Sequence, residues 1–398
     1  MAIHAVTPTD VPALARLQNR GLILGVVGLI AAAVGFAVNR DQFFQSWLIG
    51  FLFCLGLTMG SLALLMLQHL SGGQWGLMGR RVFEAASRNL PVVVLIFIPL
   101  LFRLPGVYHW AEPGVTAGDV ILQKKAGYLN VGFFIGRAVV YFGVWMFCTF
   151  MLNRYSAAQD RNEGGVVPGD TARVRTVAAP GLLAYALTAT FASVDWIMSL
   201  DPHWYSTIFG LLFIVGHGLT AFAFVIAVLA LLATTEPIAS YLTSRHFHDY
   251  GKLLLAFVML WAYLAFSQFL IIWGGNLPEE VPWYLERTTG SWGYVALVVV
   301  FGHFALPFTL LLSADLKKKP ALLAKVAVGI LAMRLVDIIW LVAPNFEHHG
   351  FPFSWMDVAI PVGLAGIWVF LFVRQLRSRP LLPLNDPFFK EAFAHEAH

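Results

Sequence analysis

The chain has 398 residues, of which 59% are hydrophobic and only 12% are charged, and its formal net charge is +4 at pH 7. Soluble domains have about 25% charged residues, so this composition excludes an ordinary soluble enzyme. Two cysteines are too few for a disulfide framework or for an iron–sulfur cluster held by this chain alone, and no CxxCH haem-attachment motif occurs. No Gly-rich nucleotide-binding run is present. We therefore expect a membrane protein with no metal or redox cofactor of its own and no nucleic-acid partner.

Ten apolar runs are candidates to cross a bilayer, which takes about 20 mostly apolar residues per helix. Strands of an outer-membrane barrel would instead alternate in polarity over about ten residues. The sequence therefore predicts an all-α polytopic membrane protein with ten transmembrane helices. The third run is short and is expected to continue back to about Ala86. The expected spans are residues 21–38, 44–70, 89–102, 131–152, 178–200, 205–233, 252–274, 290–314, 320–343 and 357–375.

Positive charge is distributed unequally between the two sides of the membrane. Most of the 26 lysine and arginine residues fall in segments on the side of the two termini. Loops rich in Lys and Arg stay in the cytoplasm, so both termini are predicted to be cytoplasmic. The first twenty residues are polar and lack a basic n-region, so we expect the first span to be an uncleaved anchor; the alternative is a signal peptide, which the small-residue run Ala31–Ala33 allows.

Residues 75–88 have the pattern of an amphipathic helix, with apolar residues on one face and charged residues on the other. This pattern is typical of a helix that lies on the cytoplasmic surface of the bilayer. The alternative is a continuation of the third span. We expect the tail from Pro380 to be a surface segment that touches a neighbour or is disordered. The charged residues of the amphipathic segment are Arg80, Arg81, Glu84 and Arg88.

The sequence contains an internal repeat, because spans two, four and five share residues in register with spans six, eight and nine. Spans two to five and six to nine are therefore predicted to form two four-helix bundles, with spans one and ten peripheral. Each bundle has an even number of helices, so the copies have the same orientation, as in parallel repeats. The predicted divisions are residues 1–43, 44–204, 205–344 and 345–398. Matching residues include Ser46, Gly50 and Gly56 with Ser206, Gly210 and Gly216, and Val194, Asp195 and Ile197 with Val336, Asp337 and Ile339.

Two long stretches resemble signatures of the membrane subunits of alternative complex III. They are SVDWIMSLDPHWYSTIFG at residues 193–210 and AFSQFLIIWGGNLPEE at residues 265–280. A third stretch, QHLSGGQWG at residues 68–76, is followed by Arg80 and Arg81 and is similar to the smaller, ActF-type subunit. These subunits belong to the wider NrfD-like, polysulfide-reductase-type family of membrane anchors, and the similarity extends over essentially all ten expected spans.

The resemblance implies a subunit of a quinol:cytochrome c oxidoreductase, or of one with another periplasmic acceptor, in a bacterial cytoplasmic membrane. It implies periplasmic partner subunits that hold iron–sulfur clusters and c-type haems, and a larger homologous NrfD-like subunit that is generally held to carry the quinol site. The smaller subunit is credited with scaffolding and a proton route. Whether this chain takes part in catalysis stays open.

Seven Asp, Arg, Lys and His residues lie at least five residues inside expected spans, where a charge near the bilayer centre costs about 3 kcal/mol. Arg137 and Asp195 lie about 8–9 Å from the outer surface in the first bundle and are expected to meet. Asp337 lies about 9 Å deep in the second bundle, with Arg334 three residues before it on the same helix face. Each pair is either a structural lock or a protonatable gate. Lys325 is expected to extend to the interface.

His217 and His303 complete the set, about 18–20 Å from the outer surface and thus near the midplane. A neutral imidazole both accepts and donates a proton, so two at one depth are candidates for a relay. The alternatives are two packing histidines or bis-histidine ligation of haem b. Leu57 of the first bundle matches His217, so a relay would be confined to the second bundle. The candidate proton-path residues are Arg137, Asp195, His217, His303, Arg334 and Asp337.

The turn at Asp201, His203 and Trp204 is a weak candidate for quinone interaction at the outer surface, because a quinone head needs hydrogen-bonding groups beside an aromatic slot. The alternative is an aromatic belt with capping carboxylates. Two other functions fit part of the pattern. A secondary transporter often has helices broken near the midplane, whereas only Pro307 is expected deep inside a span. A b-type cytochrome anchor with two haems needs four buried histidines, and only His217 and His303 are expected to be buried deep in spans.

Overall fold

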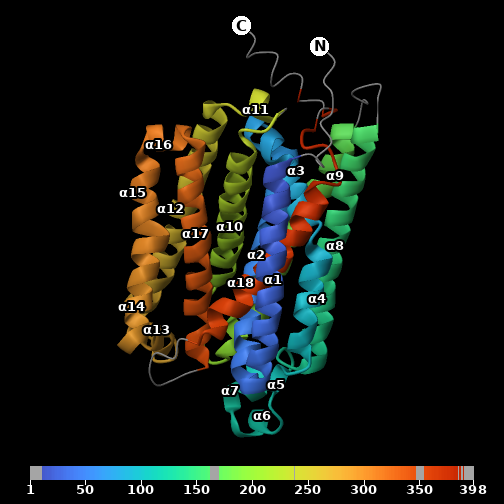
Figure 1. The fold of residues 1–398 in the computed structure, drawn as a ribbon. Coiled ribbons are helices and arrows are strands. Elements are labelled where there is room, and N and C mark those ends of the chain that lie inside the picture. Colours follow the sequence, from blue (N-terminus) through green and yellow to red (C-terminus); the bar gives the residue numbers. More distant parts are fainter. Residues whose placement is uncertain are drawn as a thin grey trace.

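The protein is helical throughout the part that the computed structural model describes, which is residues 11–161, 170–236, 238–346, 354–383, 385, 386 and 389. The sequence predicts that both termini are cytoplasmic. The first ten residues and most of the tail beyond Pro383 lie outside these ranges. Within them there is no strand, and ten helices are long and apolar enough to cross a membrane (Figure 1). The predicted fold class is confirmed.

The ten spans follow one another in the expected order, and spans three and eight are each made of consecutive segments. Span three consists of α3 and α4, and span eight of α14, the π-helix η4 and α15. The spans are α1 (Pro12–Val38), α2 (Arg40–Ser71), α3 (Gln74–Ser87) with α4 (Leu90–Leu101), α8 (Val131–Arg161), α9 (Asp170–Trp196), α10 (Phe209–Leu232), α12 (Ser244–Gly275), α14 (Gly290–Val299) with η4 (Val300–Ala305) and α15 (Leu306–Leu312), α17 (Pro320–Val342) and α18 (Met356–Leu376).

Short elements cover both ends of the bundle (Figure 1). We call the end where α1 begins and α18 ends the terminal end, and the opposite end the distal end. The terminal end carries α11 (Ile238–Tyr241) and α16 (Ala314–Lys318). The distal end carries α5 (Leu104–Val107), η2 (His109–Ala111), α6 (Val115–Gly118), α7 (Val120–Lys125), η3 (Met198–Leu200), α13 (Val281–Thr288) and η5 (Ala343–Asn345).

Eight of the spans pack as two four-helix rings with the same order of helices. In the first ring α2 packs on α4 and α9, and α8 packs on both of these. In the second ring α10 packs on α12 and α17, and span eight packs on both. The two rings join where α2 contacts α10, while α1 and α18 pair with each other and attach through α2. Because α4, α9, α10 and α18 surround it, α2 is buried along almost its whole length.

Facing glycines hold α1 against α18. Gly25 and Gly28 of α1 face Gly363 and Gly366 of α18, and a Cβ at Gly28 would overlap the backbone of Gly363. Without side chains the two backbones touch directly, which is how small residues stabilise helix pairs in membranes. Most of the other face of α1 is exposed, so α18 supplies most of the packing of this helix.

Four helices, α1, α8, α9 and α12, extend well beyond the apolar runs that predicted them. α9 begins at Asp170 rather than near residue 178, and α8 continues to Arg161 rather than ending near residue 152. Polar residues continue these helices because the backbone bonds are made within the helix whatever the side chains contact. As a result Pro180 lies inside α9, as Pro361 does inside α18. The expectation that Pro307 alone lies deep inside a span stays a prediction, because Pro180 and Pro361 lie near the ends of the expected spans 178–200 and 357–375.

Replacing Gly28 by alanine should loosen α1 from α18, because the new Cβ overlaps backbone atoms rather than a flexible side chain. Overpacking of this kind costs about 1–3 kcal/mol, so the midpoint of thermal unfolding should fall. Cys54 and Cys148 are buried, so a thiol-reactive fluorophore reports unfolding as they become accessible.

Gly143→Ala in α8 is the matched control, because a Cβ at that position meets nothing within 4 Å. Its unfolding midpoint should equal or slightly exceed that of the wild type, since alanine favours helix more than glycine does. Equal midpoints for the Gly28→Ala and Gly143→Ala variants would contradict the close backbone contact between α1 and α18.

Candidate functional site

Arg137 and Asp195 form a closed ion pair between α8 and α9 in the first bundle. Arg137 Nε and Nη2 each donate to a carboxylate oxygen of Asp195 at 2.8 Å. Tyr141 donates its hydroxyl to Asp195 Oδ2 at 2.7 Å, and Arg137 Nη1 donates to the carbonyl of Tyr128 at 2.8 Å. The rings of Tyr128 and Phe133 cover the guanidinium. The expected encounter of these two charges therefore takes place, and both carboxylate oxygens are fully engaged.

Arg334 and Asp337 form the second intramembrane ion pair, three residues apart on one face of α17. Both side chains are buried. The guanidinium of Arg334 lies against Gly216 of α10, where any Cβ would overlap it, so the glycine makes room for the charge. Trp261 of α12 is a further hydrogen-bonding neighbour of Asp337. This pair thus ties α17 to α10 and α12.

His217 lies in α10 and faces the first bundle. Its Nδ1 is 3.1 Å from the hydroxyl of Tyr185 in α9, and its ring packs on Phe213 with 4.1 Å between ring centroids. The imidazole is buried, and no described residue hydrogen-bonds its Nε2. One ring nitrogen is therefore bonded, while the other can accept or donate a proton.

His303 lies in η4, the π-helical part of span eight. Pro307 has no backbone N–H, so the carbonyl of His303, four residues earlier, loses its α-helical donor and is crowded by the proline ring. The chain accommodates this with wider turns over Val300–Ala305, an irregularity that is frequent at functional sites. The imidazole is fully buried and lies 4.2 Å from Trp261 between ring centroids. Neither ring nitrogen has a hydrogen-bond partner within the described ranges.

Arg334 is the charged group that acts on both buried imidazoles. One guanidinium is therefore in electrostatic contact with a carboxylate, Asp337, and with His217 and His303. An unsatisfied buried polar atom costs about 1–3 kcal/mol, so the open ring nitrogens of these two histidines require an explanation. Among the described residues of the first bundle, the pair of Arg137 and Asp195 has no imidazole beside it, and both oxygens of Asp195 accept hydrogen bonds.

A cavity of about 640 Å³ lies in the distal half of the second bundle, between α12, α13, α14 and α17. Tyr284 and Thr288 of α13 cover its distal end. Tyr263 and Phe266 of α12 are among its lining residues and are 66% and 62% exposed, which places its mouth on the side of the bundle. Asp337 also lines this cavity, so the cavity reaches the ion pair with Arg334.

The turn at Asp201, His203 and Trp204 packs the distal end together. Trp204 is buried and stacks on Trp283 of α13 with 4.3 Å between ring centroids. His203 Nε2 lies 2.6 Å from the carboxylate of Asp119. Backbone N–H groups at the start of α7, together with His203, hold the pKa of Asp119 below its usual value. The three turn residues point to different neighbours, and none of them lines the cavity described above.

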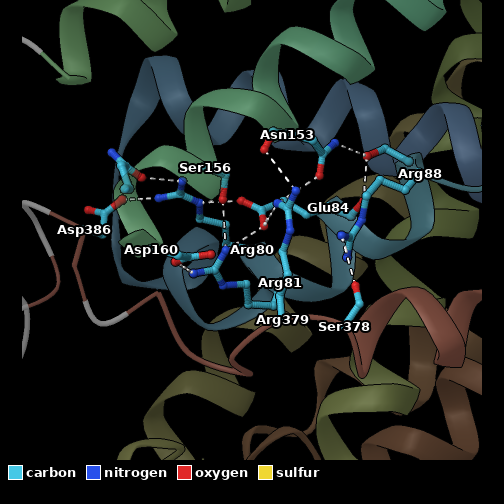
Figure 2. Close-up of polar contacts among 12 residues, drawn as sticks. Arg80, Arg81, Glu84, Arg88, Asn153, Ser156, Asp160, Ser378, Arg379 and Asp386 are labelled. Carbon is cyan, nitrogen blue, oxygen red and sulfur yellow. Dashed lines mark hydrogen bonds and ion pairs between the residues drawn. The ribbon is translucent and has the colours of Figure 1, made fainter. Parts of the chain in front are cut away.

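The charged face of α3 is buried against α8 at the terminal end (Figure 2). Arg80 donates to Glu84 Oε1 at 2.8 Å and to Gln159 at 2.7 Å. Arg81 donates to Glu84 Oε2 and to Ser156, at 2.9 Å each. Arg80, Arg81 and Glu84 are all at most 3% exposed. The prediction that this helix lies on the membrane surface is therefore wrong, because its charges pair with protein groups rather than with water or lipid head groups.

The tail completes this cluster (Figure 2). Asp386 pairs with Arg80, while Arg379 lies 3.7 Å from Glu84 and donates to the carbonyl of Asn153 at 3.1 Å. The part of the tail that the structure describes thus packs on its own chain. The expectation of a surface segment is wrong for these residues, because buried charges on α3 attract them.

Several residues that complete these sites have no strong signal in the sequence. Tyr141 follows Arg137 by four residues, and this spacing places both on one helix face. No spacing relates Tyr185 to His217, or Trp261 to His303, because each pair joins separate helices. Such contacts depend on how helices are rotated against one another.

Comparison with models of known protein families and with curated proteins finds no match to this chain. A multi-pass membrane protein with ten apolar helices is established. Its specific function is inferred from the buried groups described above and from the motifs in its sequence.

Replacing Asp195 by leucine should lower the free energy of unfolding by about 3–5 kcal/mol, because Arg137 would stay buried without a counter-charge. The double variant Arg137→Met/Asp195→Leu should be closer to the wild type, since no unpaired charge remains. The thermal midpoint, followed by thiol labelling, measures both effects.

Tyr141→Phe is the control, because it removes one hydrogen bond to Asp195 and keeps the ion pair. It should cost about 1 kcal/mol. The ion-pair interpretation fails if the double variant is less stable than the Asp195→Leu variant.

Proposed function

We propose that this chain is the smaller NrfD-like membrane subunit of a quinol:cytochrome c oxidoreductase, or of one with another periplasmic acceptor, of the alternative complex III type. It acts as a scaffold and conducts protons through its second bundle. The distal end faces the periplasm, and both termini face the cytoplasm of a bacterial inner membrane. Partner subunits that carry iron–sulfur clusters and c-type haems dock at the distal end, beside a larger homologous membrane subunit, and this chain holds no redox cofactor.

The location of the motif stretches supports this docking side. Residues 193–210 run from the end of α9 through η3 to the start of α10, and residues 265–280 run from α12 to the start of α13. Both stretches therefore meet at the distal end, where the two bundles adjoin (Figure 1). Motifs that subunits of this type share because they bind the same periplasmic partners are expected at the periplasmic end.

The observation that carries the proton-path proposal is the group of titratable side chains around Arg334. Asp337 borders a cavity on one side of this arginine, and the imidazoles of His217 and His303 keep open ring nitrogens near it. A carboxylate and two neutral imidazoles can each take up and release a proton, while the fixed positive charge biases where that proton resides. In the first bundle, Asp195 already accepts three hydrogen bonds and should conduct poorly.

The test replaces both histidines by the residues found at the matching positions of the first bundle. The changes are His217→Leu, after Leu57, and His303→Val, after Val144. In vesicles that contain the assembled complex, the double variant should oxidise quinol normally when uncoupled and should translocate fewer protons per electron.

Tyr141→Phe, in the first bundle, should leave the proton-to-electron ratio unchanged. If the double histidine variant also kept the wild-type ratio, the relay would be refuted and the histidines would be packing residues. Purification of the chain as a stable, functional monomer without associated subunits would refute its assignment to a complex.

A further inference from the structure

The cavity in the second bundle is shaped by a separation between two helices. α12 packs on η4 and α15, whereas α14 packs on α13 and α17. The cavity of about 640 Å³ lies between α12 and α14, and two of its lining residues on these spans, Tyr263 and Val300, are more than half exposed. Its volume is within the range of ligand-binding pockets, which is about 300–1,000 Å³. Since α13 covers the distal end, the cavity opens sideways, at the outer surface of the helix bundle.

The inner and distal walls of this largely apolar cavity carry polar side chains, and their hydrogen bonds define which groups donate and which accept. Ser206 donates to Gln268 Oε1 at 3.0 Å, and Gln268 Nε2 donates to the hydroxyl oxygen of Tyr284 at 3.2 Å. The hydroxyl proton of Tyr284 has no acceptor among the residues that the structure describes. Burial raises the pKa of Tyr284 to about 12, so the hydroxyl keeps this proton at neutral pH. Asp337, which pairs with Arg334, is also among the lining residues and carries carboxylate oxygens that accept hydrogen bonds.

We propose that this cavity binds a neutral membrane amphiphile, with its hydroxyl or carbonyl head between Tyr284 and Asp337 and its apolar chain leaving between α12 and α14. A donor and an acceptor facing one apolar space match an uncharged head of this kind. A charged head has no counter-ion there, because the charge of Asp337 is already paired with Arg334. Ligand binding in this cavity does not require proton transport, so each of the two proposals can be refuted without the other.

Two membrane components have the required chemistry, a quinol and a monoacylglycerol, and the experiment distinguishes them. The chain is reconstituted in phospholipid nanodiscs with one of three probes that carry a diazirine in the apolar chain. The probes are a long-chain alkyl hydroquinone, a monoacylglycerol and a phosphatidylcholine. After illumination, labelled peptides are mapped by mass spectrometry.

At least one neutral probe should label the cavity walls on α12, α14 or α17, and an excess of the same compound without diazirine should compete. The probe that labels identifies the source of the ligand. Failure of both neutral probes to label these walls would overturn the proposal, and so would equal labelling by phosphatidylcholine.

Ala296 lines the cavity, and Ala296→Phe should reduce labelling at least fivefold by filling the space. Ala186→Phe is the matched control, because this alanine is half-buried in α9 of the first bundle and should leave labelling unchanged. Tyr284→Phe removes the hydroxyl donor and should weaken binding about fivefold, the worth of one hydrogen bond. Undiminished labelling of either Ala296→Phe or Tyr284→Phe would overturn the proposal, and the second variant keeps the test valid if the first does not fold.

Discussion

A charge inside a membrane-spanning helix needs a partner within the protein, and this requirement organises the interior of the chain. Apolar side chains pack almost as well on lipid as on one another, so they do not by themselves fix how helices are rotated. The pair of Arg137 and Asp195 fixes α8 against α9. Arg334 ties α17 to the face of α10 that carries Gly216 and His217. The cluster around Glu84 does the same for α3, α8 and the tail.

The two bundles share an order of helices but use their buried charges differently. In the first bundle both carboxylate oxygens of Asp195 accept hydrogen bonds, so the ion pair holds α8 and α9 in a fixed arrangement. In the second bundle the charges adjoin unsatisfied imidazoles, a π-helical turn and a cavity. The open imidazole nitrogens, the π-helical turn and the cavity thus lie together around one ion pair of the second bundle.

The sequence predicts the spans well because each must be apolar over a length set by the bilayer. It also identifies the buried charges that lie within apolar runs, such as Arg137 and Arg334, but not Arg80, Arg81 and Glu84, which lie in a polar segment. The location of α3 could not be read in this way, because an amphipathic pattern is the same whether the polar face meets head groups or the charges of α8. The start of α9 was missed because polar residues continue a helix beyond the membrane. The cavity depends on how α12 and α14 pack on their other neighbours, and no local sequence pattern indicates this.

The position of the mouth between α12 and α14 decides how any occupant reaches the cavity. Tyr263 and Phe266 stand there among lipid-facing side chains, and α13 closes the end nearest to water. A molecule therefore enters by partitioning into the bilayer and diffusing laterally within it. Occupancy then follows the mole fraction of that molecule in the lipid phase, not its aqueous concentration. Detergent micelles dilute such a molecule, so its occupancy of the proposed site should fall as more micelle volume is added.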